Sequence, residues 1–319
     1  MRCFYKLMNS SIKLLKLLNQ QFKSKRFINI GISMACSRYE YVKEYERDDS
    51  ILPNVWIVIR VDGKGFHKFS KIHDFEKPND ENALNLMNNA AQTVMEEFRD
   101  IIISYGQSDE YSFVFRKETN VFNRRSSKLL SYVTSLFTSS YVMNWSNWMG
   151  DKKLQYPPCF DGRVVLYPSD QNLKDYLSWR QADVHINNLY NTAFWNLVLK
   201  SGLTNQQAEA ELRGTFSADK NELLFSRFGI NYNNLPAMFR KGTILLRKKV
   251  PVNEDKLKRQ LIVPIHDDLI REKFWKTHSE LLGKYTPGEY DNEDKSENKT
   301  CPEILARQIE KIKLDIKES

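Results

Sequence analysis

Cysteine is scarce in this chain, and its four cysteines lie far apart, at Cys3, Cys36, Cys159 and Cys301. No two of them form a CxxC pair, so the sequence supports neither a disulfide framework nor a zinc knuckle. A reducing compartment is the simpler interpretation. The chain also lacks a run of about eighteen apolar residues, which argues against a membrane span. Any membrane association would have to be peripheral.

Acidic residues are absent from the first 39 positions, which are rich in lysine, arginine and leucine instead. We interpret residues 1–36 as a basic leader outside the fold. Two interpretations of this leader stay open: a mitochondrial transit segment, or a disordered basic extension upstream of a true start at Met34. We therefore expect the protein in the cytoplasm or the nucleus, and also in the mitochondrion if the leader is a transit segment.

The overall composition is that of a globular protein, since 41% of the 319 residues are hydrophobic, enough for a sizeable core. Disorder throughout is thereby excluded. Lysine and arginine number 48 against 40 aspartate and glutamate, which gives a net charge of +8 and a pI near 9.1. This excess favours a partner that carries phosphates or an anionic membrane surface.

Apolar runs between turn residues predict strands, and apolar residues at helical spacing predict helices between them. The β-prone run at 55–61 ends in Asp62 and a glycine loop, and Asp80 fits the N-cap of the helix that follows. Asp109 falls at or just after the bend of a polar hairpin. The other expected elements are strands at 101–105, 111–115 and 163–167 and a helix within 123–148. The order β-α-β-β-α-β is that of a ferredoxin-like sandwich.

Beyond Asp170 the pattern changes. We expect helices at about 173–200, 205–213 and 218–228, and then strands near 243–250 and 261–265. The last residues, from Pro287 on, are rich in Glu, Asp and Lys. We interpret residues 287–319 as a charged flexible tail.

Asp62 and Asp109 are the candidate catalytic carboxylates, because the predicted topology brings the first strand beside the hairpin. Magnesium prefers one or two carboxylates and leaves its other positions to water and phosphate oxygens. Two ions about 3.5 to 4 Å apart activate an attacking hydroxyl and stabilise a leaving pyrophosphate. The alternative for each aspartate is a solvated loop carboxylate or a helix cap. The glycines that follow Asp62 favour the first interpretation, since glycine lets a nucleotide approach the backbone.

Cations surround these carboxylates in the sequence and can neutralise a triphosphate. Arg60 is the strongest of them, because it lies in an apolar strand and a buried guanidinium needs an anionic partner. Lys64 and Lys68 fit a solvated surface equally well, and His67 fits a packed or base-contacting residue better than a metal ligand. The others are Lys77, Arg124, Arg125 and Lys128.

Several motifs together resemble the eukaryotic tRNA-His guanylyltransferase family, over residues 39–250. The most specific is the heptad HINNLYN at 185–191, because core patterning alone has little chance of producing it. The others are RVDGKGFH at 60–67, KPND at 77–80, GQSDEYSF at 106–113, FDGR at 160–163 and DYLSWR at 175–180.

The resemblance implies an α+β fold: a ferredoxin-like polymerase palm, with an antiparallel sheet and helices on one face, plus a helical C-terminal region. The palm would work in the direction opposite to that of polymerases, adding guanylate to the 5′ end of tRNA-His. The expected division is the leader at 1–36, a palm-like catalytic domain at 37–170, a helical and β extension for tRNA and activation at 171–286, and the tail at 287–319.

The resemblance also implies site residues. Asp62, Asp109 and the carbonyl of Gly63 would bind two Mg²⁺ ions. GTP would be bound by the metal-site residues together with Lys64, Gly65, Phe66, His67, Lys77 and Ser108, with Asp80 and Glu110 in support. Gly65 leaves the side-chain contact at its own position open, since the family varies there.

Further residues are expected to serve activation by ATP or contact with tRNA. Arg60, Arg125 and Lys128 are candidates for the triphosphate of the activating nucleotide. His185, Asn188, Asn191 and Lys220 are candidates for activation or tRNA contacts, and the sequence does not divide these two roles. A structural alternative is that Asn187 and Asn188 satisfy buried backbone groups. Kinship also implies a homotetramer built as a dimer of dimers.

Three alternative functions stay open from the sequence. A noncatalytic RNA-binding module shares the β-α-β-β-α-β order, but it presents aromatic side chains on its sheet rather than an aspartate at the strand end. A nucleotidyl cyclase uses a similar palm with two acidic residues. A template-dependent polymerase that repairs tRNA 5′ ends is the nearest alternative, and the heptad at 185–191 favours the tRNA-His enzyme over it.

Overall fold

The computed structural model describes residues 37–251 and 258–283. The predicted leader at 1–36 and the predicted tail at 287–319 therefore lie outside the described residues. The chain divides after Asp48. Before that point the described residues form one short 3₁₀ helix, η1 (Glu40–Tyr45), which buries none of its side chains. The fold from Asp49 onward carries the predicted site.

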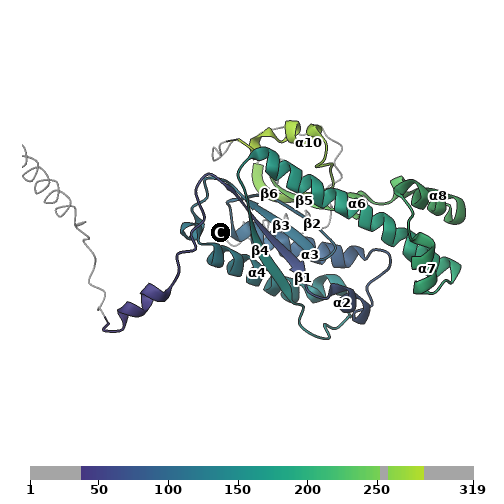
Figure 1. Ribbon diagram of the computed structural model, residues 1–319, viewed down its shortest axis with the longest axis horizontal. Coiled ribbons are helices and arrows are strands. Elements are labelled where there is room, and N and C mark those ends of the chain that lie inside the picture. The colour runs from purple at the N-terminus through teal and green to yellow at the C-terminus, as the bar shows by residue number, and fades with distance from the viewer. Residues whose placement is uncertain (1–36, 252–257, 284–319) are drawn as a thin grey trace, which may run out of the picture. The chain divides into compact units, whose positions relative to one another are not determined.

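A six-stranded antiparallel sheet forms the centre of this part of the chain (Figure 1), in the order β4-β1-β3-β2-β5-β6. Its strands are β1 (Trp56–Gly63), β2 (Ile101–Gln107), β3 (Glu110–Phe115), β4 (Phe160–Tyr167), β5 (Thr243–Pro251) and β6 (Lys258–Ile265). All six are strands that the sequence predicts, and the hairpin of β2 and β3 carries Asp109 at its bend as expected. The predicted α+β fold is confirmed.

Helices cover both faces of the sheet. Alternate residues of β1 point to opposite sides. Ile57 and Ile59 pack in one cluster with α3 (Glu81–Glu97) and α4 (Ser126–Met143), whereas Trp56 and Val58 pack in another with α6 (Asp170–Ser201). α3 and α4 lie on one face of the sheet, as expected. α6 lies on the opposite face, which the sequence did not predict. The uninterrupted apolar run of β1 is the reason, because a strand that is apolar at every position must be buried on both sides.

The C-terminal elements complete the same fold. β5 pairs with β2 and extends the sheet that begins at β1. Figure 1 shows α7 (Asn205–Leu212) and α8 (Ser217–Phe228) gathered at the C-terminal end of α6, where they form a third apolar cluster with it. None of the described helices is long and apolar enough to cross a membrane. The remaining elements are α2 (Phe66–Ile72), η2 (Val121–Arg124), α5 (Trp145–Met149), η3 (Tyr232–Asn234), α9 (Ala237–Lys241), α10 (Glu272–Thr277) and η4 (Ser279–Leu281).

Candidate active site

Asp62 and Asp109, far apart in sequence, lie at the same end of the sheet. The antiparallel pairing of β1 with β3 places Asp62 opposite Glu110. One residue further on, the N–H of Gly63 donates a hydrogen bond of 2.9 Å to the carbonyl oxygen of Asp109. Both aspartates line one pocket. The backbone ladder of two neighbouring strands therefore sets the distance between the two predicted metal ligands.

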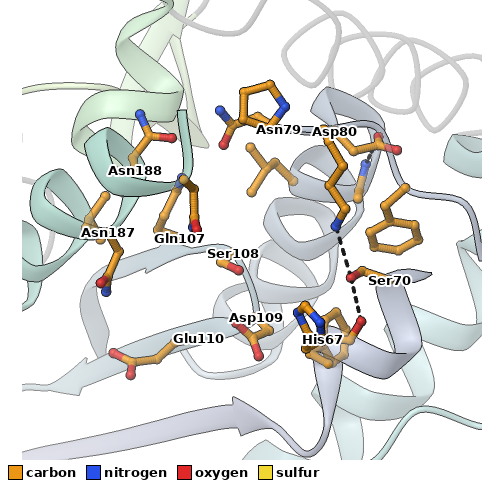
Figure 2. Close-up of a pocket in the computed structure, with 18 of the residues that line it drawn as sticks. His67, Ser70, Asn79, Asp80, Gln107, Ser108, Asp109, Glu110, Asn187 and Asn188 are labelled. Atoms are coloured by element: carbon orange, nitrogen blue, oxygen red, sulfur yellow. Dashed lines mark hydrogen bonds between the residues drawn. The ribbon is translucent and has the colours of Figure 1, made fainter. Parts of the chain in front are cut away.

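The pocket has a volume of about 580 Å³, within the range of small-molecule sites. Three parts of the chain surround it: α2 with the loop that follows, the β2–β3 hairpin, and α6. Figure 2 shows side chains from all three around the same space: His67 and Ser70 on α2, Asn79 and Asp80 at the start of α3, Gln107, Ser108, Asp109 and Glu110 on the hairpin, and Asn187 and Asn188 on α6.

Asp109 has the more perturbed carboxyl group of the two. Burial raises the pKa of Asp109 to about 6, and the charges of Asp62 and Glu110 raise it further, while a hydrogen bond from Ser108 opposes the shift. Ser108 itself adopts a left-handed conformation, with φ of 56°. A buried carboxylate beside two others is costly unless a cation joins them. The electrostatics thus favour a positively charged ligand at this end of the pocket.

Glu110 links the hairpin to α6 through Arg180 and to β1 through Arg60. Arg180 donates to both carboxylate oxygens of Glu110, at 3.1 and 2.9 Å, and to Asp183 at 2.8 Å. Arg60 approaches the same carboxylate at 3.7 Å. Arg60 is half-buried, and the expectation that it needs an anion is met within the chain. Burial alone no longer favours a triphosphate contact for Arg60, and that role stays a prediction.

Gly63, in the glycine loop after β1, has a different role from the approach of a nucleotide that the sequence predicts. A side chain there would collide with the ring of Phe66, because an added Cβ would lie 2.3 Å from a ring carbon. Glycine is thus required for packing of Phe66, not for access of a ligand to this backbone position. Gly65 behaves as expected of an open position: its φ is 66° and an added Cβ would meet nothing within 4 Å. Lys64 is exposed, and its backbone N–H donates to the carbonyl oxygen of Cys159 at 2.8 Å.

Lys77 spans the pocket from α2 to α6. Its ammonium donates to Ser70 at 3.2 Å and lies 5.5 Å from the ring centroid of Trp195. Burial lowers the pKa of Lys77 from its usual value, and the charge of Asp80 opposes this shift. The carboxylate of Asp80 accepts hydrogen bonds from the N–H groups of Ala83 and Glu76, so it caps α3 as predicted and also fixes the loop before it.

On α6 the predicted residues divide between two sides of the helix. Asn191 lines the pocket with Asn187, one turn before it. Asn188 also borders the pocket but is buried, and its amide donates to the hydroxyl of Tyr232 at 3.0 Å. Asn188 thus has a hydrogen-bond partner inside the fold, as its structural interpretation requires. Asn187 is exposed. His185 lies outside the pocket, with its ring 5.3 Å from that of Tyr232.

Three other predicted residues also lie away from the pocket. Lys220, on α8, donates to the carbonyl of Thr215 at 2.7 Å. Arg125 pairs with Asp49 at 3.2 Å at the start of α4, and Lys128 is one turn further along α4, on its exposed surface. This start of α4 adjoins the residues that precede β1, so the run of β1 from Trp56 to Asp62, about 20 Å long, separates it from Asp62. Within one chain the pocket residues and these cations are not brought together.

Trp195, Gln107 and Asn79 are pocket residues that the sequence interpretation missed. Trp195 follows Asn187 and Asn191 at four-residue spacing, which places all three on one face of α6. That spacing was the available signal. Gln107 and Asn79 lie inside motifs already singled out, but a single amide within a motif has no distinctive pattern that assigns it to a pocket.

The donor set at the pocket fits a hard cation such as Mg²⁺. Two carboxylates, from Asp62 and Asp109, meet its preference for few protein oxygens. Within residues 37–251 and 258–283, no group of three or more His, Cys, Asp or Glu side chains has the arrangement of a metal site. A transition metal with a full set of protein ligands is thus not what these residues offer.

Comparison with known proteins shows which family the sequence matches. The family model described as tRNAHis guanylyltransferase matches residues 39–168, and the model described as Thg1 C terminal domain matches residues 171–316. A probable tRNA(His) guanylyltransferase of Drosophila melanogaster is 74% identical over 276 residues, covering 86% of this chain and 94% of that protein. The human protein of the same description is 54% identical over 274 residues, covering 81% and 92%.

Solved structures agree as well. The crystal structure of the tRNA(His) guanylyltransferase from Saccharomyces cerevisiae superimposes with a TM-score of 0.63 at 49% identity, covering 70% of this chain and 96% of that one. A bacterial tRNA(His) guanylyltransferase-like protein in complex with ATP gives 0.62 at 21% identity, covering 77% and 99%, and supports the fold alone. Fold, pocket and relatives together define a nucleotidyltransferase. The chain belongs to the tRNA(His) guanylyltransferase family, which confirms the resemblance seen in the sequence.

Proposed function

We propose that this enzyme adds one guanylate to the 5′ end of tRNA-His, using ATP, GTP and two Mg²⁺ ions. The observation that carries the proposal is the convergence of Asp62 and Asp109 on one pocket beside the glycine loop. Family membership supports the transfer of guanylate. A noncatalytic RNA-binding module would have no use for two neighbouring carboxylates at a buried, repulsive site.

The reaction has three steps. First, the 5′-monophosphate of the tRNA attacks the α-phosphate of ATP, which forms an adenylylated 5′ end and releases pyrophosphate. The 3′ hydroxyl of GTP then attacks the tRNA phosphate of this end and displaces AMP. Finally, water removes pyrophosphate from the triphosphate of the added guanylate. Mg²⁺ at the carboxylates would activate the attacking hydroxyl and neutralise the leaving groups.

The residues of this chain act by binding and orientation. Asp62, Asp109 and the carbonyl of Gly63 would hold the cations. GTP would lie against Lys64, Gly65, Phe66, His67 and Ser108, and Lys77 would offer its ammonium to phosphate. The rigid Glu110–Arg180 pair would keep the hairpin, and with it Asp109, in place.

The tRNA and the activating nucleotide would reach residues outside the pocket. Asn191 lines the pocket, while His185 and Lys220 lie on the C-terminal lobe formed by α6 and α8. These serve activation or tRNA contact. Arg125 and Lys128 would bind phosphate at the opposite end of β1, which suits a long substrate or a neighbouring subunit better than one small nucleotide. We keep the proposal of a dimer of dimers on kinship alone.

The test is transfer itself. Protein, Mg²⁺, ATP and labelled GTP are incubated with 5′-monophosphorylated tRNA-His, and the product is resolved at single-nucleotide length. We expect extension by one guanylate, dependent on ATP and on the 5′ phosphate. RNA binding without extension would support the binding module, and a cyclic nucleotide formed without RNA would support a cyclase.

A second assay distinguishes the proposed tRNA-His enzyme from a polymerase that repairs tRNA 5′ ends. The same assay is run on a tRNA whose GUG anticodon has been replaced and on a tRNA truncated at its 5′ end. We expect the anticodon change to lower transfer strongly. Equal extension of both, with several templated nucleotides on the truncated tRNA, would favour 5′-end repair.

A further inference from the structure

Trp179, on α6, is a tryptophan that the fold leaves in contact with water. All six tryptophans of the chain lie among the described residues, and only Trp179 is more than half exposed, at 55%. Trp56, Trp145 and Trp275 are at most 4% exposed. An indole offers about 150–250 Å² for burial, so an exposed one forgoes a large stabilisation and is typical of binding surfaces.

The guanidinium of Arg180 covers one face of this indole. Its central carbon lies 3.7 Å from the centroid of the Trp179 ring. The same guanidinium donates to both carboxylate oxygens of Glu110 and to Asp183, so it cannot turn away from its place. A cation held over an aromatic face is a favourable contact. The indole is therefore ordered in advance, and its exposed surface lies on its remaining sides.

A short chain of contacts joins Trp179 to the candidate catalytic carboxylates. The indole contacts Arg180, and Arg180 is bonded to Glu110 at 2.9 Å. Glu110 directly follows Asp109 and is the cross-strand partner of Asp62. Arg180 also lines the pocket, so its guanidinium lies between the pocket and the indole. Trp179 thus flanks the end of the pocket at which the reaction is proposed to occur.

Cations lie on the same side of the sheet. Arg60 follows Val58 by two residues, so it projects from the face on which Val58 packs with α6. Arg163 is the cross-strand partner of Arg60 on β4 and projects from that face too. The side chain of Arg163 is 51% exposed, and its ion pair is with the equally exposed Asp161. Exposed guanidinium groups and an aromatic ring are the two features with which proteins bind unpaired RNA.

We propose that Trp179 is a stacking platform for an unpaired base at the end of the RNA substrate. The base assigned to it is the first unpaired one of the 3′ strand, which lies across from the position that the new guanylate fills. The inference deepens the proposed function and rests on it, because it assumes an RNA whose 5′ phosphate reaches Asp62 and Asp109. Stacking accepts any base, since every base has an aromatic face. Trp179 would hold the RNA end in place and take no part in bond making.

The first test compares Trp179→Leu and Trp179→Phe with wild type on a 5′-monophosphorylated tRNA-His transcript. Trp179→Leu should raise the dissociation constant for this RNA, measured by filter retention, about tenfold, and KM for the RNA by a similar factor. KM for GTP and kcat should stay within about twofold, because the indole lies outside the pocket. Trp179→Phe keeps an aromatic face and should recover most of the affinity. Unchanged RNA affinity in Trp179→Leu would overturn the proposal.

The second test asks whether Trp179 contacts the assigned base. A matched transcript carries an abasic residue at the first unpaired position of the 3′ strand. Wild type should bind this RNA about tenfold more weakly than the intact one, whereas Trp179→Leu should bind both RNAs alike. If the two losses of affinity add, the indole and the base act independently, and the assignment is wrong.

Tyr132→Leu is the matched control, since Tyr132 is an aromatic residue of α4, on the other face of the sheet, and is 50% exposed. Its RNA affinity should stay within twofold of wild type, and a tenfold loss there would refute a specific role for Trp179. A fall in the melting temperature of Trp179→Leu but not of Trp179→Phe would show that the ring only supports the Arg180–Glu110 pair. A change in the sedimentation of Trp179→Leu without RNA would show that a second copy of the chain covers the indole instead.

The proposed function can fail separately from this role. If wild type binds the transcript but adds no guanylate, the proposed function is wrong, and the abasic comparison still decides whether Trp179 stacks on the base. If wild type extends the RNA and Trp179→Leu binds and extends it equally well, only the role of Trp179 is rejected.

Discussion

The N–H of Gly63 donates a hydrogen bond of 2.9 Å to the carbonyl oxygen of Asp109. This bond continues the ladder of β1 and β3 one step beyond the pair of Asp62 and Glu110. The main chain of Asp109 is thus bonded to the residue that directly follows Asp62. A cation site at these two aspartates would be organised before any ligand arrives, which is how catalytic electrostatics avoid reorganisation during the reaction.

Asp109→Asn should reduce guanylate transfer by at least about a hundredfold, because it removes the charge of a proposed cation ligand and keeps the size of the side chain. Binding of tRNA, measured by filter retention, should stay within about threefold, since Asp109 contacts no phosphate in this arrangement. Asp161→Asn is the control: Asp161 lies opposite Asp62 on β4 but is exposed and paired with Arg163. Full transfer by Asp109→Asn would refute the cation site.

The stability of the metal-free protein should depend on pH through Asp109. Its pKa of about 6 in the fold exceeds 3.8, the ordinary value, so the folded state binds this proton more tightly than the unfolded chain does. The stability contributed by the proton is full below about pH 4 and is lost as the pH rises through about 6. The loss is up to about 3 kcal/mol, at 1.36 kcal/mol per pKa unit.

Asp109→Asn cannot undergo this loss. Urea denaturation at pH 4, 5.5 and 7.5 should therefore show the variant gaining on wild type as the pH rises, when both are free of metal. Saturating Mg²⁺ should reverse the order at pH 7.5 by stabilising wild type only. A stability difference between the variant and metal-free wild type that stays the same from pH 4 to pH 7.5 would contradict the buried, repulsive environment of Asp109.

The sequence predicts the carboxylates well, because local patterns determine them. Asp62 ends an apolar run and Asp109 sits in a polar bend between two such runs, so pairing of the runs was enough to bring both together. Asp80 is similarly local, since a cap and its helix are neighbours in sequence. The sequence did not predict that a helix, α6, packs on the second face of the sheet. α6 packs on the sheet through Leu173 and, further along, on α7 and α8. Because one helix has two different packing partners, its apolar pattern does not identify either of them.

The sequence also could not assign a role to side chains whose type fits two different contacts. The burial argument for Arg60 correctly required an anion, but an arginine pattern does not say whether Glu110 or a phosphate supplies it. Gly63 was assigned to ligand approach, whereas the ring of Phe66 occupies that space. Trp195 looks like any core aromatic until the fold shows Lys77 against it. Each distinction depends on contacts between segments far apart in the chain.

Arg180→Met should destabilise the fold by about 2 kcal/mol, because it leaves Glu110 half-buried with only the more distant Arg60 as a partner. Transfer should fall as well, since the hairpin next to Asp109 loses its anchor on α6. Arg163→Met, which breaks the exposed pair with Asp161, should change stability by less than about 0.5 kcal/mol.

A double-mutant cycle with Glu110→Gln isolates the pair. The combined variant should be less destabilised than the sum of the two single variants, because each change removes the partner whose charge the other leaves unpaired. Strict additivity in urea denaturation would show that Arg180 and Glu110 act independently, and the proposed anchoring of the hairpin would then be wrong.

Trp195→Leu should raise KM for GTP about fivefold with little effect on kcat. The indole holds the ammonium of Lys77 between α6 and Ser70, and the contact of a cation with an aromatic face is worth about 1 kcal/mol. Without the ring, Lys77 must be ordered by the nucleotide itself. Trp195→Phe keeps an aromatic face and should restore most of the affinity, and Lys77→Met in the Trp195→Leu background should add less than it does alone. If Trp195→Leu lowers kcat and leaves KM unchanged, the tryptophan serves the reacting end rather than Lys77, and this account of the pocket wall is wrong.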